Sequence, residues 1–411
     1  MKLDLIIRDG TIIDGSGMPR YRADVGISNG KVVEIGRLGG PAREVIEAEG
    51  QVVAPGFIDG HTHMDAQVSW DPLGTCSCWH GVTSVLMGNC GFTLAPCRES
   101  EKDLVLRNLE RAEDISPAAM EAGIDWTWET FPEYLDRLDE LPKGINYGAY
   151  VGHSALRTYA MGEKAFEAQA SEDELAIMCR QVRDAIRAGA IGFSSSRSPS
   201  HLTPEGQPVA SRVAPWSEVQ ALVGEMGKMN AGIFEVAQER PAPDRIHEWF
   251  GRMKDLAVDS GRPITWGVFS RKATPELWRQ YFELLDETAA AGGRMFAQVH
   301  SRALTVLLSF ETRLPFDPMP VWSDMRKKPL AEQKAMLQDP AFKAKLLEVA
   351  RNPDPKFQGV GAEARLPEYD WIYFLDTMKG PHRTVSEIAA ERGVEPAEAM
   401  IDLALERDMH A

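Results

Sequence analysis

The sequence predicts a parallel (β/α)8 barrel, of which seven strands are visible, preceded by a small antiparallel β domain. Residues 3–53 contain short alternating strands around tight turns, and from about residue 54 apolar strands alternate with amphipathic helices, which is typical of a parallel α/β fold. A chain of 411 residues that is 44% apolar can bury a core of this size. We predict domains at 1–53, 54–302 and 303–411.

The first domain is predicted from its turns. Asn29-Gly30 separates the β-branched runs DVGIS and KVVEIG, and Asn-Gly between apolar runs is the strongest short signal for a β-hairpin. Another Gly-containing turn interrupts the run LDLIIRDGTIIDG. Because no helix separates these strands, we expect a small antiparallel sheet that is not part of the barrel.

Seven apolar segments are expected to form the barrel strands: APGFIDGHTH, GVTSVLMGN, NYGAYVGH, AIGFSSS, GIFEVAQ, PITWGVF and RMFAQVH. Helices are expected between them. The clearest begins at the N-cap Ser171, has Glu174 in position to complete a capping box, and ends at Gly189.

The last hundred residues have a different pattern. They predict long charged helices at 329–351 and 384–407, and no eighth barrel strand is visible in 303–411. We therefore expect a mostly helical insertion that precedes an absent eighth strand. This pattern predicts a C-terminal truncation, because an open parallel sheet would leave strand edges uncovered.

Composition excludes several classes of function. With 45 basic and 61 acidic residues, the net charge of −16 argues against a nucleic-acid or anionic-membrane surface. The start MKLDLIIRDG lacks the features of a secretory signal, and no run approaches the roughly 18 apolar residues of a membrane span. Five scattered cysteines do not form a disulfide framework. We expect a cytoplasmic protein; the oligomeric state is not indicated.

The sharpest chemical signal ends the first barrel strand, in the run GFIDGHTH. His61 and His63 are two positions apart, so on a strand both side chains point to one side. They would face the barrel interior at the carboxyl end of the strand, where barrel active sites form. Two convergent neutral imidazoles make half of a metal site. The alternative is a pair of ordinary histidines, because a bare H-x-H arises easily by chance.

The run VVAPGFIDGHTHMD, preceded by IIRDGTIIDGSG and DVGISNGKVVEIG, resembles the amidohydrolase superfamily. HTHMD followed by GVTSVLMGNCGFTLAP, with VGHSALR and SSSRSP further on, is similar to its N-acyl-D-amino-acid deacylase (D-aminoacylase) branch. The resemblance runs to about residue 200. It implies a barrel of the metal-dependent hydrolase type with a small β-sandwich, zinc as the metal, and hydrolysis of an amide bond in an N-acyl amino acid.

Cys90 follows the second strand, at the same end of the barrel as the two histidines. The resemblance implies that this cysteine replaces the metal-bridging carboxylated lysine of most amidohydrolases, and a thiolate is a good zinc ligand. The alternative is a buried free cysteine, which is the commonest kind. Gly88 and Gly91, on either side of the Asn-Cys pair, favour an exposed turn.

Three further residues are candidates for the site. We assign Asp65 to catalysis, where it could orient a ligand imidazole or a water, or else cap a loop. The resemblance places His153 at the active-site rim, and we assign it to catalysis too; a hydrogen-bonded histidine in the barrel mouth is the alternative. Arg197 could clamp a substrate carboxylate with its planar fork, or form an ordinary ion pair.

The chain departs from the family pattern on its fifth and sixth strands, which lack the expected histidines. The nearest polar residues are Glu235, Gln238 and Lys272. His300, after the seventh strand, is the remaining strand-end histidine, and we name it as a replacement ligand. One zinc ion is therefore expected rather than two.

The predicted function is hydrolysis of a carbon–nitrogen bond other than a peptide bond, with a small N-acyl-D-amino acid as the substrate. A zinc ion would polarise the carbonyl and activate a water, and a carboxylate would transfer the proton. The family's base, an aspartate of the eighth strand, lies outside the 411 residues, so we expect this chain to be inactive. Alternatives are a cyclic amidase or aminohydrolase, or a non-catalytic ligand-binding scaffold.

Overall fold

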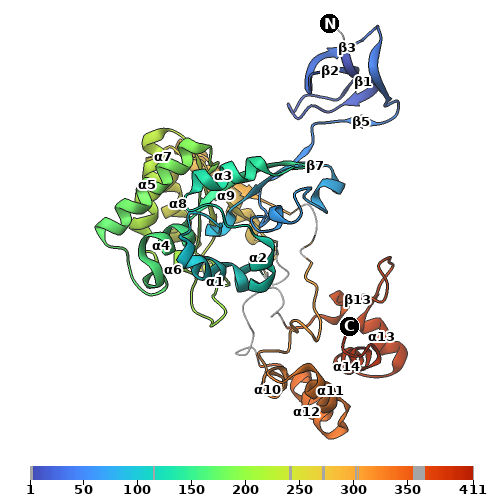
Figure 1. The fold of residues 1–411 in the computed structure, drawn as a ribbon. Helices are drawn as coiled ribbons and strands as arrows, with labels where there is room; N and C mark the ends of the chain where they lie inside the picture. The colour runs from blue at the N-terminus through green and yellow to red at the C-terminus, as the bar shows by residue number, and fades with distance from the viewer. Residues whose placement is uncertain are drawn as a thin grey trace. The chain divides into compact units, whose positions relative to one another are not determined.

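The computed structural model describes residues 3–113, 116–239, 243–270, 274–300, 303, 305–354 and 366–410. The chain divides into two compact units, Met1–Gln298 and Val299–Ala411 (Figure 1). None of the helices in the described ranges is both long and apolar enough to cross a membrane.

The first unit begins with a five-stranded sheet of order β3-β2-β1-β4, in which β5 also pairs with β1. Its strands are β1 (Leu3–Ile12), β2 (Tyr21–Ser28), β3 (Lys31–Gly36), β4 (Ala42–Glu47) and β5 (Val52–Val53). The β2–β3 hairpin turns at Asn29 and Gly30, both with positive φ, as the Asn-Gly signal predicts.

The expectation of a wholly antiparallel sheet is wrong, because β4 and β5 run parallel to β1. β3 and β4 both run in the direction of β1, so the chain between them passes from one edge of the sheet to the other.

The centre of the first unit is a parallel sheet of seven strands in which neighbours in sequence are neighbours in space, as in the wall of a barrel. The strands are β6 (Phe57–Asp59), β7 (Val82–Met87), β8 (Asn146–Gly152), β9 (Gly192–Ser196), β10 (Ile233–Ala237), β11 (Ile264–Gly267) and β12 (Met295–Gln298). Each of the seven predicted segments contains one of them. Within the described residues the sheet has no eighth strand, as the sequence predicts.

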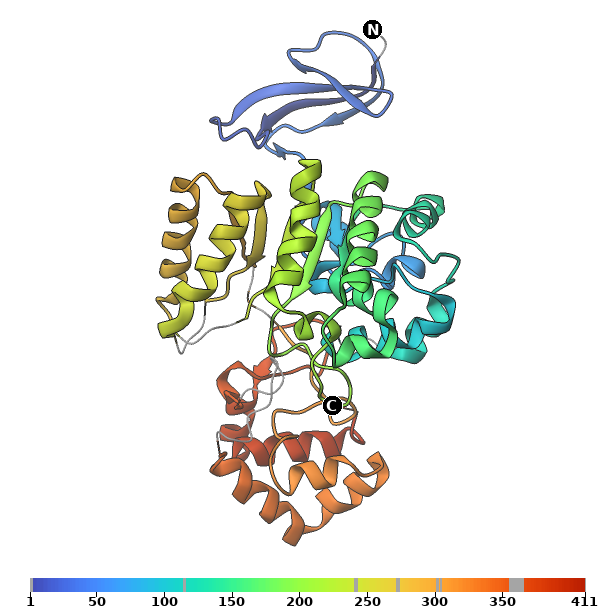
Figure 2. The same cartoon turned by 90° about the vertical axis from the view of Figure 1, so that its left-hand side faces the viewer.

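Helices connect these strands and form a layer over the sheet (Figure 2). They are α1 (Lys102–Glu113), α2 (Pro117–Gly123), α3 (Phe131–Glu140), α4 (His153–Met161), α5 (Glu172–Ala188), α6 (Ala210–Val213), α7 (Trp216–Met229), α8 (Ile246–Ser260) and α9 (Leu277–Ala290). The predicted capping box of Ser171 and Glu174 begins α5, and Gly189 ends it with φ 114°. α5 packs against α3 and α7, and α7 against α8.

The two faces of the parallel sheet differ in polarity. Phe193 and Phe234 are in register on β9 and β10 and stack with ring centroids 5.6 Å apart, in the core shared with the helices. The next residues, Ser194 and Glu235, are also in register and point to the opposite face. Both are buried, so the interior face of the sheet carries buried polar groups.

The second unit consists mainly of α10 (Trp322–Arg326), α11 (Leu330–Gln338), α12 (Pro340–Arg351), α13 (Val385–Arg392) and α14 (Pro396–Glu406), with a small hairpin of β13 (Tyr373–Phe374) and β14 (Arg383–Thr384). The predicted helices 329–351 and 384–407 are each two helices. Pro340 begins α12 after the cap Asp339, and Gly393, with φ 65°, ends α13 before Pro396 begins α14, as these residues tend to do.

Candidate metal centre

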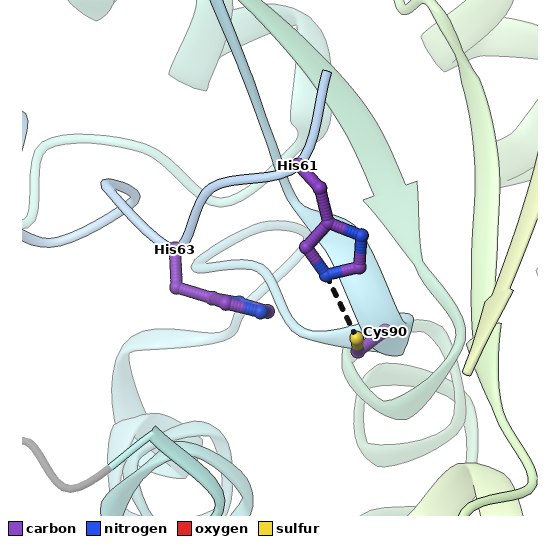
Figure 3. Close-up of side chains that lie close together, drawn as sticks. All are labelled: His61, His63 and Cys90. Carbon is purple, nitrogen blue, oxygen red and sulfur yellow. Dashed lines mark hydrogen bonds between the residues drawn. The ribbon is translucent and has the colours of Figure 1, made fainter. Parts of the chain in front are cut away.

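The three candidate metal ligands follow the carboxyl ends of two adjacent strands. His61 and His63 lie just beyond β6, and Cys90 lies in the turn after β7 (Figure 3). One possible ligand atom from each residue lies within 4.8 Å of the other two. His61 Nε2 is 3.3 Å from Cys90 Sγ, and the two imidazole centroids are 5.3 Å apart. The structure therefore brings together the three residues singled out from the sequence.

The turn that carries Cys90 has an unusual backbone. Gly88, Cys90 and Gly91 have φ of 75°, 58° and 80°, and only glycine adopts such values without steric cost. A Cβ on Gly88 would lie 2.3 Å from the carbonyl oxygen of Tyr150. Cys90 is buried, so the expectation of an exposed turn is wrong: the glycines allow the turn to fold inward, against neighbouring strands.

Side chains from three places fix this turn. Asp65 Oδ2 accepts a hydrogen bond from Gly88 N at 3.0 Å, and Glu235 Oε2 accepts one from Cys90 N at 2.6 Å. Ser194 Oγ accepts a hydrogen bond from Gly91 N at 3.0 Å. The surroundings thus hold Cys90 in a conformation that an isolated cysteine would avoid.

Gln298, the last residue of β12, determines the proton position on His61. Gln298 Nε2 donates to Gly60 O at 3.4 Å, so its Oε1 faces His61 Nδ1 at 2.8 Å. An amide oxygen only accepts, and Nδ1 therefore carries the proton. In a neutral imidazole this leaves the lone pair on Nε2, which lies 3.3 Å from Cys90 Sγ, and this is the tautomer that a metal ligand requires.

His63 is held in its neutral form. Burial lowers the pKa of His63 well below its usual value, and His61 and His201 add to the effect. His201 was not predicted as a site residue: it lies in the loop after β9, outside any periodic pattern. Its Nδ1 is 2.7 Å from Ser196 Oγ, and its ring lies 5.1 Å from that of Phe92. Neutral imidazoles are the form in which histidine binds metal.

Glu235 is the main site residue to which the sequence assigned no role. It is 0% exposed on β10, and its Oε1 lies 3.7 Å from His61 Nδ1. Within the described part of the chain Oε1 has no hydrogen-bond partner. Burial raises the pKa of this carboxyl to about 8, against the opposing hydrogen bond from Cys90. The only signal was one acidic residue in the apolar run IFEVA.

Asp65 supports the Cys90 turn, in keeping with the loop-capping alternative that the sequence left open, and its assignment to catalysis remains a prediction. It is 1% exposed beneath the Cys90 turn, and burial raises the pKa of its carboxyl to about 7. Its bond to Gly88 N supports the turn, so the geometry makes Asp65 a residue that positions Cys90.

His153 has the hydrogen-bonded environment that the sequence left open as its alternative, and its assignment to catalysis remains a prediction. It is the first residue of α4 and is 0% exposed. Its Nδ1 is 2.9 Å from Ser195 Oγ and its Nε2 is 2.8 Å from Glu218 Oε1. Both nitrogens are therefore engaged within the fold. Ser195 alternates with the interior-facing Ser194, which places this network on the helix side of the sheet.

The group of possible ligands found among the described residues contains none of the remaining predicted residues. His300 is exposed and belongs to the second unit, and the group of possible ligands found among the described residues does not include it. Arg197 directly follows β9, and its Nη1 donates to Ala214 O at 2.6 Å; its role as a carboxylate clamp remains a prediction. Lys272 lies outside the described residues.

Comparison with known proteins gives a consistent assignment. A model described as "Amidohydrolase family" matches residues 44–352. The D-aminoacylase of Alcaligenes xylosoxydans xylosoxydans is 36% identical over 193 residues, which are 47% of this chain and 37% of that protein. The N-acyl-D-glutamate deacylase of the same organism is 38% identical over 195 residues, again 47% of this chain and 37% of that protein. The matched part is thus little more than a third of these relatives.

A solved structure resembles the fold over most of the chain. It is the N-acyl-D-glutamate deacylase from Bordetella bronchiseptica, complexed with zinc and a phosphonate inhibitor. The alignment covers 98% of this chain and 70% of that one, with a TM-score of 0.63 and 24% sequence identity. The likeness supports the curled parallel sheet with an N-terminal sheet as the architecture of this chain.

Proposed function

Because the chain belongs to the amidohydrolase family, we propose that it is a metal-dependent hydrolase that deacylates an N-acyl-D-amino acid. The observation that carries the proposal is the convergence of His61, His63 and Cys90 at the carboxyl end of the parallel sheet. Relatives named D-aminoacylase and N-acyl-D-glutamate deacylase support the substrate class. The match spans little more than a third of those relatives, and the activity of the whole protein is inferred from that part.

The donor set suits zinc. Two neutral imidazoles and one thiolate are ligands that Zn²⁺ prefers, and three protein ligands leave the fourth position of a tetrahedral site for water or substrate. The Nδ1–H tautomer of His61, held by Gln298, supports this assignment. We propose one ion, because the described residues provide one such group.

When bound, zinc supplies Lewis acidity to the substrate carbonyl and lowers the pKa of a ligated water. Residues of the chain orient the metal ligands: Gln298 fixes the His61 ring, and Asp65 holds the Cys90 turn. Arg197, at the end of β9, would bind the carboxylate of the amino acid through its two-pronged guanidinium. A small acylated amino acid would thus lie across the carboxyl ends of the strands.

The test is metal content together with turnover. Purified protein should hold about one zinc per chain by elemental analysis, and Cys90→Ser should reduce this content severely. Cys179→Ser is the matched control, because Cys179 lies on α5 and is not in the ligand group; its zinc content should equal that of the wild type. A panel of N-acyl-D- and N-acyl-L-amino acids then tests the substrate. Protein that binds no zinc would refute the metal-dependent function, and zinc-loaded protein that prefers the L series would refute the D-amino-acid assignment.

A further inference from the structure

Glu235 has a buried carboxyl group, of which one oxygen is hydrogen-bonded among the described residues. Its Oε2 accepts from Cys90 N at 2.6 Å, whereas its Oε1 has no hydrogen-bond partner within the described residues. Among those residues, the ion-pair neighbour of Glu235 is His61, whose Nδ1 is 3.7 Å from Oε1. Gln298 Oε1 lies 2.8 Å from His61 Nδ1, so the Nδ1–H bond of His61 is directed at Gln298 and not at Glu235. Ionising a buried carboxyl group without a countercharge is costly, and among the described residues no cation is paired with Glu235 to offset that cost.

The charges of the proposed centre explain the arrangement. A divalent ion on His61, His63 and Cys90 would bring two positive charges, of which the Cys90 thiolate offsets one. A carboxylate at Glu235 would offset the other, and the buried centre would then be neutral. Charge interactions inside a protein are much stronger than in water, so the second negative charge would matter for the affinity of the ion.

Glu235 lies on a different strand from the three ligands and is close to two of them, Cys90 and His61. It lies on β10, whereas His61 and His63 follow β6 and Cys90 follows β7. Through the Cys90 N–H it holds the turn in its left-handed conformation, with φ 58° at Cys90, and its second oxygen faces the His61 ring.

We propose, on the premise of the metal-dependent function above, that Glu235 is a positioning residue of the metal centre. It fixes the Cys90 turn through the backbone N–H and supplies the negative charge that balances the bound ion. It acts through Cys90 and His61 and is not itself one of the three ligands.

Glu235→Gln separates charge from hydrogen bonding, because the amide oxygen can still accept from Cys90 N while the charge is gone. We expect its zinc affinity, measured by competition with a chromophoric chelator, to fall about 10–100-fold, as for other residues that support metal ligands. The thermal midpoint of the metal-free variant should equal or exceed that of the wild type, because the glutamine amide cannot ionise in this buried position. Glu235→Asp retains the charge and should recover part of the affinity.

Glu225→Gln is the control. Glu225 is also largely buried, but it pairs with Arg183 at 2.7 Å and Lys228 at 2.6 Å on the helix layer. Its replacement should lower the thermal midpoint of the metal-free protein and leave zinc affinity unchanged.

Three outcomes overturn the proposal. Unchanged zinc affinity in Glu235→Gln removes the charge-balancing role. A metal-free Glu235→Gln protein that is less stable than the wild type, or that fails to fold, makes Glu235 a structural residue. If the wild type itself binds no zinc, the metal-dependent function fails first, and the wild-type titration shows this before any variant is compared.

Discussion

Glu218→Gln should destabilise the first unit by about 3–5 kcal/mol, the usual cost of breaking a buried ion pair by removing one partner. Glu218 is 3% exposed on α7. Arg157 Nη1 donates to its Oε1 at 2.6 Å and its Oε2 at 2.7 Å, and His153 Nε2 lies 2.8 Å from Oε1. The glutamine would leave the buried guanidinium of Arg157 without its countercharge.

The pKa of Glu218 gives an independent estimate of the stability that would be lost in Glu218→Gln. Burial alone would raise it, but the hydrogen bonds and charges of His153 and Arg157 outweigh burial and lower it from 4.5 to about 2. At 1.36 kcal/mol for each pKa unit, this corresponds to about 3 kcal/mol at neutral pH. Because the folded-state pKa is depressed, this stability is present above pH 4.5 and is lost as the pH falls toward 2.

Urea unfolding of the wild type and the variant at pH 7 and at pH 3 measures both effects. The difference in the free energy of unfolding between the two proteins should be larger at pH 7 than at pH 3. At pH 3 the ionised Glu218 of the wild type contributes less to stability, because protonation of Glu218 in the unfolded chain is then nearly complete. Glu225→Gln, on the same helix but with partly exposed partners, should cost only about 1 kcal/mol. Equal losses for the two variants, or a difference that does not change with pH, would refute the reasoning.

Three further predictions follow from the metal centre. Gly88→Ala should lower the free energy of unfolding by at least about 1–2 kcal/mol, because of its positive φ and the 2.3 Å approach of the new Cβ to Tyr150 O; thermal melts of the purified variant measure this. Asp65→Asn should stabilise the metal-free protein at pH 7 and not at pH 3.5. Burial raises the pKa of Asp65 to about 7, so the free energy of unfolding of the wild type falls as the pH rises from about 4 to 7. Urea titrations of the two proteins at both pH values measure the difference. Free zinc at 100 times its dissociation constant should stabilise the folded protein by about 2.7 kcal/mol, and chelation should reverse the shift in thermal midpoint.

The barrel strands and the ligand group could be predicted from the sequence because their signals are local. Apolar runs mark the seven strands, and the i, i+2 spacing of His61 and His63 places both imidazoles on one side. Cys90 follows the next strand, and the carboxyl ends of adjacent parallel strands meet at one edge. These are statements about short segments and the order in which they pair.

The partners of those ligands could not be predicted, because they are distant in the chain. Glu235 is 145 positions from Cys90, and Gln298 is 237 positions from His61. Strand periodicity says which face each residue occupies and not which residue it meets there. The same limit explains His153: its position at a strand end suggested the active site, whereas its contacts to Ser195 and Glu218 place it in the helix layer.

The hydrogen bond between His61 and Gln298 has a consequence for the order of folding. It joins the first and last strands of the parallel sheet across 237 positions, so His61 cannot reach its final tautomer and orientation until β12 has been synthesised. At about 5–20 residues per second, the ribosome takes roughly 10–50 s to add that length of chain. During this interval the nascent histidines and cysteine lack the preorganised geometry of the folded site. Correct zinc capture is therefore expected to be a late event, after the last strand has docked.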